Sequence, residues 1–181
     1  KSNIDPTNVY FHGNNKSSQE LELAIDHNIR IVVDNPHELS LIQSIAESKQ
    51  KKALIMFRIK PGIEAHTHEY IKTGHNDSKF GLEFTETLPL ISMVHQSKWG
   101  QFIGIHAHIG SQIFDITPYY DLISILVGFI DTIYTELNIE VEELNCGGGF
   151  GIQYTSHDDP PDISKLILQM ATELKLLCDE K

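Results

Sequence analysis

Hydrophobic and polar positions along this chain fall into blocks that predict strands and helices in alternation. Short apolar or β-prone runs predict five strands, at residues 9–12, 29–33, 53–59, 102–105 and 139–144. Between and after these runs, apolar residues recur every three or four positions, which is the spacing of one helix face. The segments with this spacing are 17–25, 35–46, 87–97, 117–137 and 162–174.

Three of the predicted helices carry recognisable start signals. Ser17, followed three positions later by Glu20, forms a capping box. Asn35 is an N-cap residue directly before Pro36, a residue favoured in the first helical turn. Asp162 takes the capping position before the last helix. The expected inner faces of the first two helices are Leu21, Ala24 and Ile25, then Leu39, Ile42, Ile45 and Ala46.

The predicted strands are too uniformly apolar to face water on one side, which favours a parallel sheet covered by helices. A doubly wound sheet and part of a (β/α)8 barrel both fit this pattern. Polar residues gather where the predicted strands end, namely Asn14, Asn35, Arg58, His108 and Ser111. In a barrel that edge carries the chemistry, so we favour an α/β fold of the (β/α)8 TIM type. A complete barrel needs about 250 residues, so these 181 residues would supply five of eight β/α units.

Length and composition narrow the classes of function. The 181 residues suit a single domain, and a net charge of −11 offers no basic surface for nucleic acid. The two cysteines, Cys146 and Cys178, provide no disulfide framework, which fits the reducing cytoplasm. No signal peptide is predicted, because residues 1–10 are polar and include Pro6. No membrane span is predicted, because polar residues interrupt the longest apolar stretch, 122–133. The absence of an initial methionine and the uncapped last helix indicate a segment of a longer protein.

The stretch 145–151, Asn-Cys-Gly-Gly-Gly-Phe-Gly, leaves the main chain bare at the end of a predicted strand. Glycines there reach positive φ angles or let a ligand approach the backbone closely. Successive N–H groups in such a turn can bind an anion, most often a phosphate. The spacing is neither that of a nucleotide P-loop nor that of a dinucleotide-binding turn. The stretch is therefore either a phosphate cradle or a tight strand-to-helix turn that binds nothing.

His106 and His108 lie two positions apart at a predicted strand end, so both side chains would point to the same face. One interpretation is a metal site completed by further histidines, namely His12, His66, His68 and His75. A second places a neutral imidazole against an aromatic cofactor ring, and a third is a hydrogen-bonded pair within the barrel. The residues that follow, Gly110 and Ser111, suit a phosphate neighbour. A ring to stack on and a phosphate to hold predict a phosphorylated aromatic cofactor.

Five motifs follow one another along the chain, at 12–17, 58–62, 78–81, 106–113 and 147–152. Each motif alone is weak, but in this order they resemble the diaminopimelate decarboxylases, pyridoxal-phosphate enzymes of the alanine-racemase-like barrel group. The resemblance covers nearly the whole chain. It implies that the five strands are the third to seventh of the barrel, and that residues 1–181 are a partial pyridoxal-phosphate-binding domain.

The resemblance also implies roles for individual residues. His108 matches the histidine that stacks on the pyridine ring of pyridoxal 5′-phosphate, and is the expected catalytic residue. Arg58 matches an arginine beneath the cofactor, the alternative being a surface arginine at a strand end. The implied phosphate contacts are Ser111, Gly147, Gly148 and Gly149. No metal site is implied.

Lysines in this chain do not match the one that binds the cofactor covalently. Lys79 matches a lysine near the dimer interface of relatives, and Lys16 is interpreted as a solvated turn residue. His75 and Asp77, in the same loop as Lys79, are expected to be structural. The covalent lysine, the acidic partner of the pyridine nitrogen and a C-terminal β domain would all lie outside this segment. We therefore expect the segment alone to be inactive.

The function implied by the resemblance is that of a lyase in lysine biosynthesis. The substrate would be meso-diaminopimelate and the products L-lysine and CO2, in a cytoplasmic homodimer whose active site lies near the interface. Three alternatives stay open. The first is another decarboxylase or racemase of the same group, such as one of the ornithine or arginine type. The second is a metal-dependent barrel hydrolase that uses His106 and His108. The third is a non-catalytic homologue.

Overall fold

The computed structural model describes residues 3–63 and 80–179. These residues fall into two compact units. The first unit draws on residues 1–60, 79–106 and 141–145, and the second draws on 61–78, 107–140 and 146–181. The sheet and three helices make up the first unit, and two long helices with their connecting segments make up the second.

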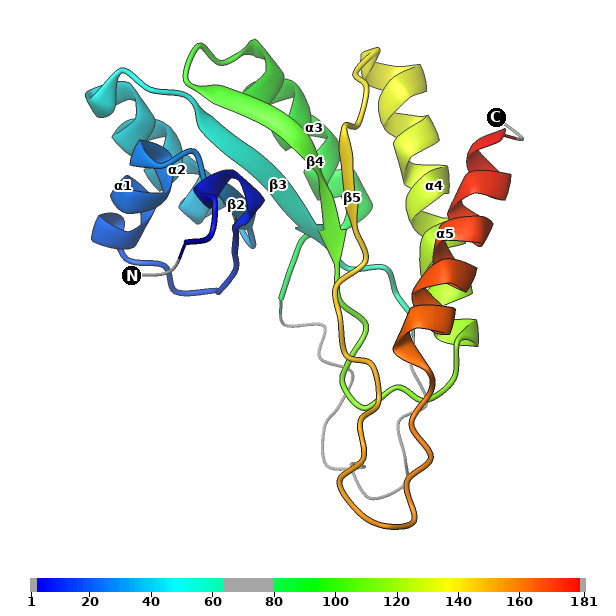
Figure 1. The fold of residues 1–181 in the computed structure, drawn as a ribbon. Helices are drawn as coiled ribbons and strands as arrows, with labels where there is room; N and C mark the ends of the chain where they lie inside the picture. The colour runs from blue at the N-terminus through cyan, green and yellow to red at the C-terminus, as the bar shows by residue number, and fades with distance from the viewer. Residues whose placement is uncertain (1–2, 64–79, 180–181) are drawn as a thin grey trace. The chain divides into compact units, whose positions relative to one another are not determined.

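The first unit is built on a sheet of five strands in the order β1-β2-β3-β4-β5 (Figure 1). The pairs β1–β2, β2–β3 and β4–β5 are parallel. The strands are β1 (Tyr10–Phe11), β2 (Arg30–Val33), β3 (Ala53–Ile59), β4 (Gly100–Ala107) and β5 (Glu143–Asn145). The helices of this unit are α1 (Ser18–Asp26), α2 (Pro36–Lys49) and α3 (Phe84–Gln96), and a 3-10 turn, η1 (Pro6–Asn8), precedes β1.

Strand order distinguishes the two architectures that the sequence left open. Each strand lies beside the next one along the chain, and the order never reverses. Crossovers between parallel strands are right-handed almost without exception, so an unreversed order places the connecting helices of this unit, α1, α2 and α3, on the same face. A doubly wound sheet reverses its order to cover both faces. The topology is therefore that of a barrel segment.

Contacts across the sheet show that it curls. The Arg30 Nε on β2 donates to both carboxylate oxygens of Glu143 on β5, at 2.6 and 2.7 Å. The Tyr10 hydroxyl on β1 donates to the same carboxylate at 3.0 Å. In the sheet, β3 and β4 separate β2 from β5, and β1 lies one strand further away. Side chains of the first two strands can reach the fifth only across a concave face, which is the geometry of a barrel interior.

Helix starts and inner faces in the first unit follow the sequence predictions. The Ser17–Glu20 capping box forms, and the Asn35 side chain accepts a hydrogen bond from the Glu38 N–H at 2.9 Å. The predicted inner faces of α1 and α2 are buried: Leu21, Ala24, Ile25, Leu39, Ile42, Ile45 and Ala46. In Figure 1, α3 lies behind β3 and β4.

Strand ends differ from the predicted ones. β1 contains only two residues, so Val9 and His12 lie outside it. β5 starts at Glu143 instead of Ile139, because its pairing with β4 runs only from Glu143 to Asn145. β4 begins two residues before Phe102.

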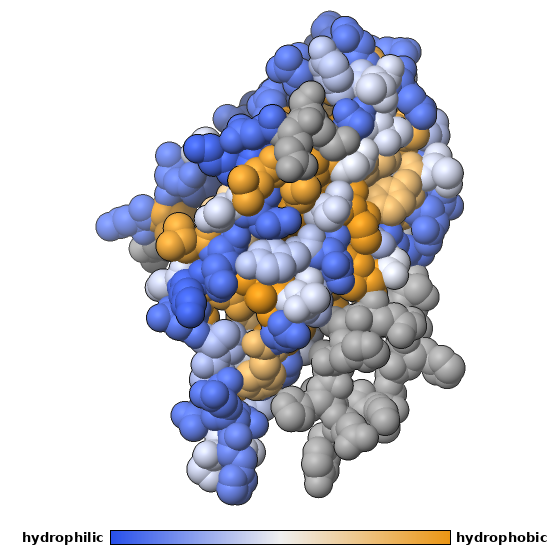
Figure 2. All heavy atoms as spheres, turned by 90° about the vertical axis from the view of Figure 1, so that its right-hand side faces the viewer, coloured by the Kyte–Doolittle hydropathy of each residue, from blue (hydrophilic) through white to orange (hydrophobic). Residues whose placement is uncertain are grey.

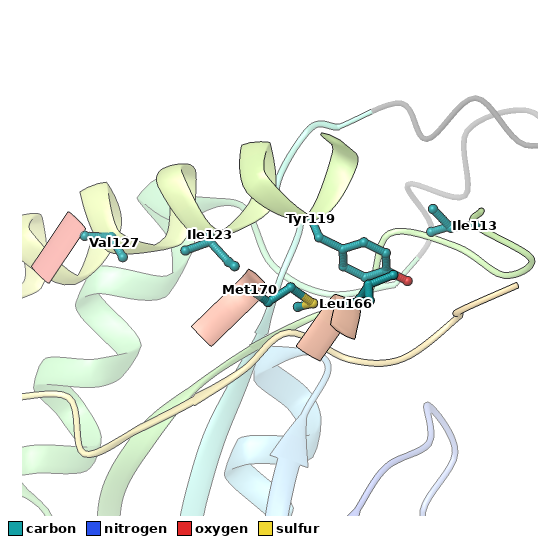
Figure 3. Close-up of a cluster of buried hydrophobic side chains, with 6 residues drawn as sticks. All are labelled: Ile113, Tyr119, Ile123, Val127, Leu166 and Met170. Atoms are coloured by element: carbon teal, nitrogen blue, oxygen red, sulfur yellow. The ribbon is translucent and has the colours of Figure 1, made fainter. Parts of the chain in front are cut away.

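The second unit is a pair of helices, α4 (Thr117–Leu137) and α5 (Ile163–Asp179), packed around a small core. Tyr119, Ile123 and Val127 of α4 meet Leu166 and Met170 of α5 in this core (Figure 3). Asp162 begins α5 as predicted, since its side chain accepts a hydrogen bond from the Lys165 N–H at 3.2 Å.

Apolar surface remains on the side of the molecule where α5 lies (Figure 2). The exposed apolar residues of α5 are Ile163, Ile167, Leu168 and Leu176. Within the described ranges, no helix is long and apolar enough to span a membrane.

Candidate functional site

The glycine stretch runs parallel to the segment that follows β4. The Ile113 N–H donates to the Gly149 carbonyl at 2.9 Å, and the Gly151 N–H donates to the Ile113 carbonyl at 2.8 Å. A parallel bridge between Ile113 and Phe150 joins the two segments. Because α5 begins only at Ile163, the stretch is an extended ledge and not a tight strand-to-helix turn.

Two of the three consecutive glycines are explained by packing within the chain. Gly147 and Gly149 have φ angles of +73° and +91°, which favour glycine. A Cβ on Gly147 would lie 2.6 Å from the Ala107 carbonyl oxygen, and one on Gly149 would collide with the Gly110 carbonyl oxygen. Gly148 differs, because its φ is not positive and a Cβ there would meet no atom within 4 Å. Packing gives no reason for a glycine at 148, whereas close approach of a ligand does.

His108 lies against this ledge. It is exposed and follows the last residue of β4. Its Nδ1 lies 3.0 Å from the position of a Cβ on Gly147, and its Cε1 lies 3.4 Å from that of a Cβ on Gly149. The structure therefore brings three predicted site residues together. A flat ligand with an anionic group could meet an imidazole face and a bare main chain at the same place.

His106 has different surroundings from His108. It is buried, its Nδ1 lies 3.1 Å from Asn145 Oδ1, and its ring meets that of His12 edge-on at a centroid distance of 4.3 Å. The expectation that both histidines share one face assumed that the strand reached His108, and β4 ends at Ala107. The described residues bring together no group of three metal-ligating side chains. His66, His68 and His75, like Asp77 and Lys79, lie outside the described residues.

Ser111 is exposed in the segment that pairs with the glycine ledge. Its neighbour Gln112 holds the two segments together, since its side-chain amide donates to the Ile152 carbonyl at 3.0 Å and accepts from the Ile152 N–H at 2.9 Å.

Arg58, on β3 in the first unit, is paired with an acidic residue. Its guanidinium donates to Asp34 Oδ1 at 3.3 Å and lies 5.2 Å from the centre of the Phe80 ring. The Asp34 side chain is 8% exposed and that of Arg58 is 21% exposed. The Arg58 guanidinium is thus fixed by Asp34 beside the carboxyl end of β2, and Arg58 is not a free surface side chain.

Lys16 corrects the sequence interpretation. It was expected to be a solvated turn residue, but its side chain is 1% exposed. The ammonium donates to the Gly13 carbonyl at 2.5 Å, the Val32 carbonyl at 2.7 Å and Glu38 Oε1 at 2.7 Å. A buried charge is tolerated when it is paired and fully hydrogen-bonded. Spacing along the chain could not reveal this pair, because its members lie 22 residues apart.

Side chains beyond three neighbouring strands of the first unit share one polar cavity of about 390 Å³. Asn14 follows β1, Asp34 and Asn35 follow β2, and Lys60 follows β3. The carboxyl ends of parallel strands meet at one edge of a sheet, which explains why these residues converge. The predicted gathering of polar residues at this edge is confirmed for Asn14 and Asn35.

Residues 1–181 match a family model described as the pyridoxal-binding domain of pyridoxal-dependent decarboxylases. The chain belongs to this family. Diaminopimelate decarboxylases are among its similar relatives. That of Bacillus methanolicus is 45% identical over 170 residues, covering 92% of this chain and 39% of the relative. That of Synechocystis is 45% identical over 173 residues, covering 96% of this chain and 37% of the relative. The chain thus spans about two fifths of these relatives' length.

Solved structures of this family give the same fold. Diaminopimelate decarboxylase from Helicobacter pylori, complexed with L-lysine, is 31% identical with a TM-score of 0.84, covering 95% of this chain and 43% of that one. The enzyme from M. jannaschii, also in complex with L-lysine, is 32% identical with a TM-score of 0.80, covering 96% of this chain and 41% of that one. The prediction of a partial (β/α)8 barrel is confirmed.

Proposed function

We propose that this chain is the part of a pyridoxal 5′-phosphate-dependent decarboxylase that holds the cofactor's ring and phosphate. The whole protein converts meso-diaminopimelate to L-lysine and CO2. One observation carries the proposal: the exposed ring of His108 lies against Gly147 and Gly149, within a chain 45% identical to diaminopimelate decarboxylases.

The residues present fit this cofactor. The open space beside Gly148 admits a phosphate where a side chain would stand in the way. His108 offers an imidazole face next to it, and Ser111 is exposed in the adjoining segment. Arg58 is the further cofactor-binding residue of the proposal, and Asp34 holds its guanidinium in place. The bound cofactor supplies an electron-withdrawing ring for the loss of CO2 from an amino acid.

The protein's contribution is to position these groups. The glycine ledge fixes the phosphate end, and His108 sets the plane of the ring. A fixed ring plane decides which bond of an amino-acid substrate is aligned for cleavage. The chain forms the third to seventh units of the barrel. The covalent lysine and a C-terminal β domain come from other parts of a cytoplasmic homodimer whose active site lies near the interface.

A first prediction tests the role of His108 in the full-length protein. We expect His108→Ala to weaken cofactor binding and to lower decarboxylation of meso-diaminopimelate by roughly 100-fold, because ring orientation is lost. The measurements are the absorbance spectrum of bound pyridoxal 5′-phosphate and the release of CO2. His157→Ala, in an exposed loop, is the matched control. An unchanged spectrum together with unchanged turnover would contradict the role.

Substrate identity is tested on the same preparation with meso-diaminopimelate, ornithine, arginine and alanine. Preferential turnover of another amino acid would replace the substrate part of the proposal. Bound cofactor without turnover of any of them would favour a non-catalytic homologue. Bound metal, with no affinity for pyridoxal 5′-phosphate, would favour the hydrolase.

A further inference from the structure

Tyr119 is a buried side chain that the proposed function does not yet use. It lies in the first turn of α4, is fully buried and packs beside the Phe150 ring at a centroid distance of 5.1 Å. Figure 3 shows its ring among Ile123, Leu166 and Met170. Its hydroxyl donates a hydrogen bond to the Gly148 carbonyl at 3.1 Å. The core of the second unit thus reaches the middle of the glycine ledge.

This hydrogen bond fixes the orientation of one peptide unit. The Gly148 carbonyl and the Gly149 N–H belong to the same peptide plane, and the described chain contains no cis peptide bond. In a trans peptide the carbonyl and the N–H point in opposite directions. Since the carbonyl points to Tyr119, the Gly149 N–H points away from the core. Among the described residues, no backbone carbonyl accepts a hydrogen bond from this N–H.

Other hydrogen bonds fix the neighbouring peptide units of the ledge, whereas the Gly148–Gly149 peptide is bound by the Tyr119 hydroxyl. Ile113 binds the Gly149 carbonyl and the Gly151 N–H, which lie in the next two peptide units. Gly148 has no side chain to pack against its neighbours and so restrain its backbone, and the space where a Cβ would lie is open. A glycine peptide without such restraint can rotate at low cost.

We propose that Tyr119 is a positioning residue that turns the Gly148–Gly149 peptide so that the Gly149 N–H faces the cofactor phosphate. This rests on the proposed function, because it names what orients the phosphate cradle. A hydrogen bond to the carbonyl also polarises the amide and makes its N–H a better donor. Burial raises the pKa of the Tyr119 hydroxyl to about 12, so it stays a neutral donor at physiological pH. A phenolate would repel the phosphate.

The test uses Tyr119→Phe in the full-length protein, which keeps the ring and removes only the hydroxyl. Apoprotein is titrated with pyridoxal 5′-phosphate and, separately, with pyridoxal, which lacks the phosphate. We expect the Kd for pyridoxal 5′-phosphate to rise roughly 3- to 10-fold, as loss of one hydrogen bond predicts. The Kd for pyridoxal should stay unchanged. Tyr134→Phe, on the exposed side of the same helix, is the matched control and should change neither value.

Each outcome bears on one claim. Wild-type protein that binds no pyridoxal 5′-phosphate overturns the proposed function itself. If wild-type protein and Tyr119→Phe bind pyridoxal 5′-phosphate with the same Kd, the role of Tyr119 is overturned. It is also overturned if the Kd values of the variant for pyridoxal 5′-phosphate and for pyridoxal rise equally, because that result marks general destabilisation. If the variant does not fold, hydrogen exchange of the Gly149 amide in wild-type protein replaces it. Exchange should slow when pyridoxal 5′-phosphate is added to apoprotein, and unchanged exchange overturns the inference.

Discussion

At the scale of single residues, Gly148 and Gly149 are adjacent and chemically identical, yet they have different reasons to be glycine. Gly149 has a φ of +91° and lies against the Gly110 carbonyl, whereas Gly148 has ordinary backbone geometry and open surroundings. The requirement at Gly149 belongs to folding, and under the proposed function the requirement at Gly148 belongs to ligand binding. Substitution of each by alanine therefore separates stability from affinity.

We expect Gly149→Ala to lower the free energy of unfolding by about 1–3 kcal/mol, because the new methyl group collides with backbone. Gly148→Ala should unfold like wild type but bind pyridoxal 5′-phosphate at least roughly tenfold more weakly, about 1.4 kcal/mol. Denaturant unfolding and cofactor titration are the two measurements. Tight cofactor binding by Gly148→Ala would show that the open space beside Gly148 is not the phosphate site.

Lys16 and Glu38 form a buried ion pair that ties the start of α2 to the loop after β1. Glu38 also accepts a hydrogen bond from the Asp34 N–H at 2.8 Å, and Asp34 in turn binds Arg58. Removal of one partner from a buried pair leaves an uncompensated charge, which costs about 3–5 kcal/mol. The pair thus supports the segment that holds Arg58.

We therefore expect Lys16→Met to lower the free energy of unfolding by about 3 kcal/mol, measured by denaturant unfolding. Lys51→Met, at a side chain that is 49% exposed, is the control and should change stability by less than about 1 kcal/mol. The double variant Lys16→Met/Glu38→Gln should lose less free energy of unfolding than the two single variants lose together, because it leaves no unpaired buried charge. A loss at Lys16 as small as that at Lys51 would contradict the buried pair.

At the scale of elements, prediction succeeded where local chemistry decides. The caps at Ser17 and Asn35 are hydrogen bonds between residues three apart, so sequence alone reveals them. It failed at the extent of β5, since pairing with β4 decides which residues of 139–145 form the strand. It also failed at Lys16, because two of its partners, the Val32 carbonyl of β2 and the Glu38 carboxylate, lie 16 and 22 positions along the chain.

The pairing of β4 with β5 depends on a missing side chain. Gly104 is paired with Glu143, and a Cβ on Gly104 would collide with the Glu143 carbonyl oxygen. We expect Gly104→Ala to lower the free energy of unfolding by about 1–3 kcal/mol, because the strands must separate. Gly128→Ala, at an exposed helical position with open space, is the control and should stabilise by up to about 1 kcal/mol. Equal stability of the two variants would contradict the close strand approach.

At the scale of the whole molecule, alternation of strands and helices was enough to predict a parallel α/β fold, and the polar residues at the predicted strand ends favoured a barrel. The strand order confirms it. The contact of Arg30 with Glu143 across the curled sheet could not be predicted, because these residues lie 113 positions apart. His108, the catalytic histidine of the proposal, could be located from its motif. The contact of Tyr119 with the glycine ledge could not, since its aromatic ring also suits an ordinary helix core.

Because the sheet curls, we predict that β2 and β5 are energetically coupled although they are not neighbours in the sheet. Arg30 and Glu143 have side chains 21% and 23% exposed, and the contact uses both carboxylate oxygens. In a double-mutant cycle of Arg30→Met and Glu143→Gln, we expect a coupling energy of about 1–2 kcal/mol. The more exposed pair Lys49–Asp26 should give less than about 1 kcal/mol. A flat sheet would hold Arg30 and Glu143 two strands apart, so a coupling near zero would show that the concave face does not close in solution.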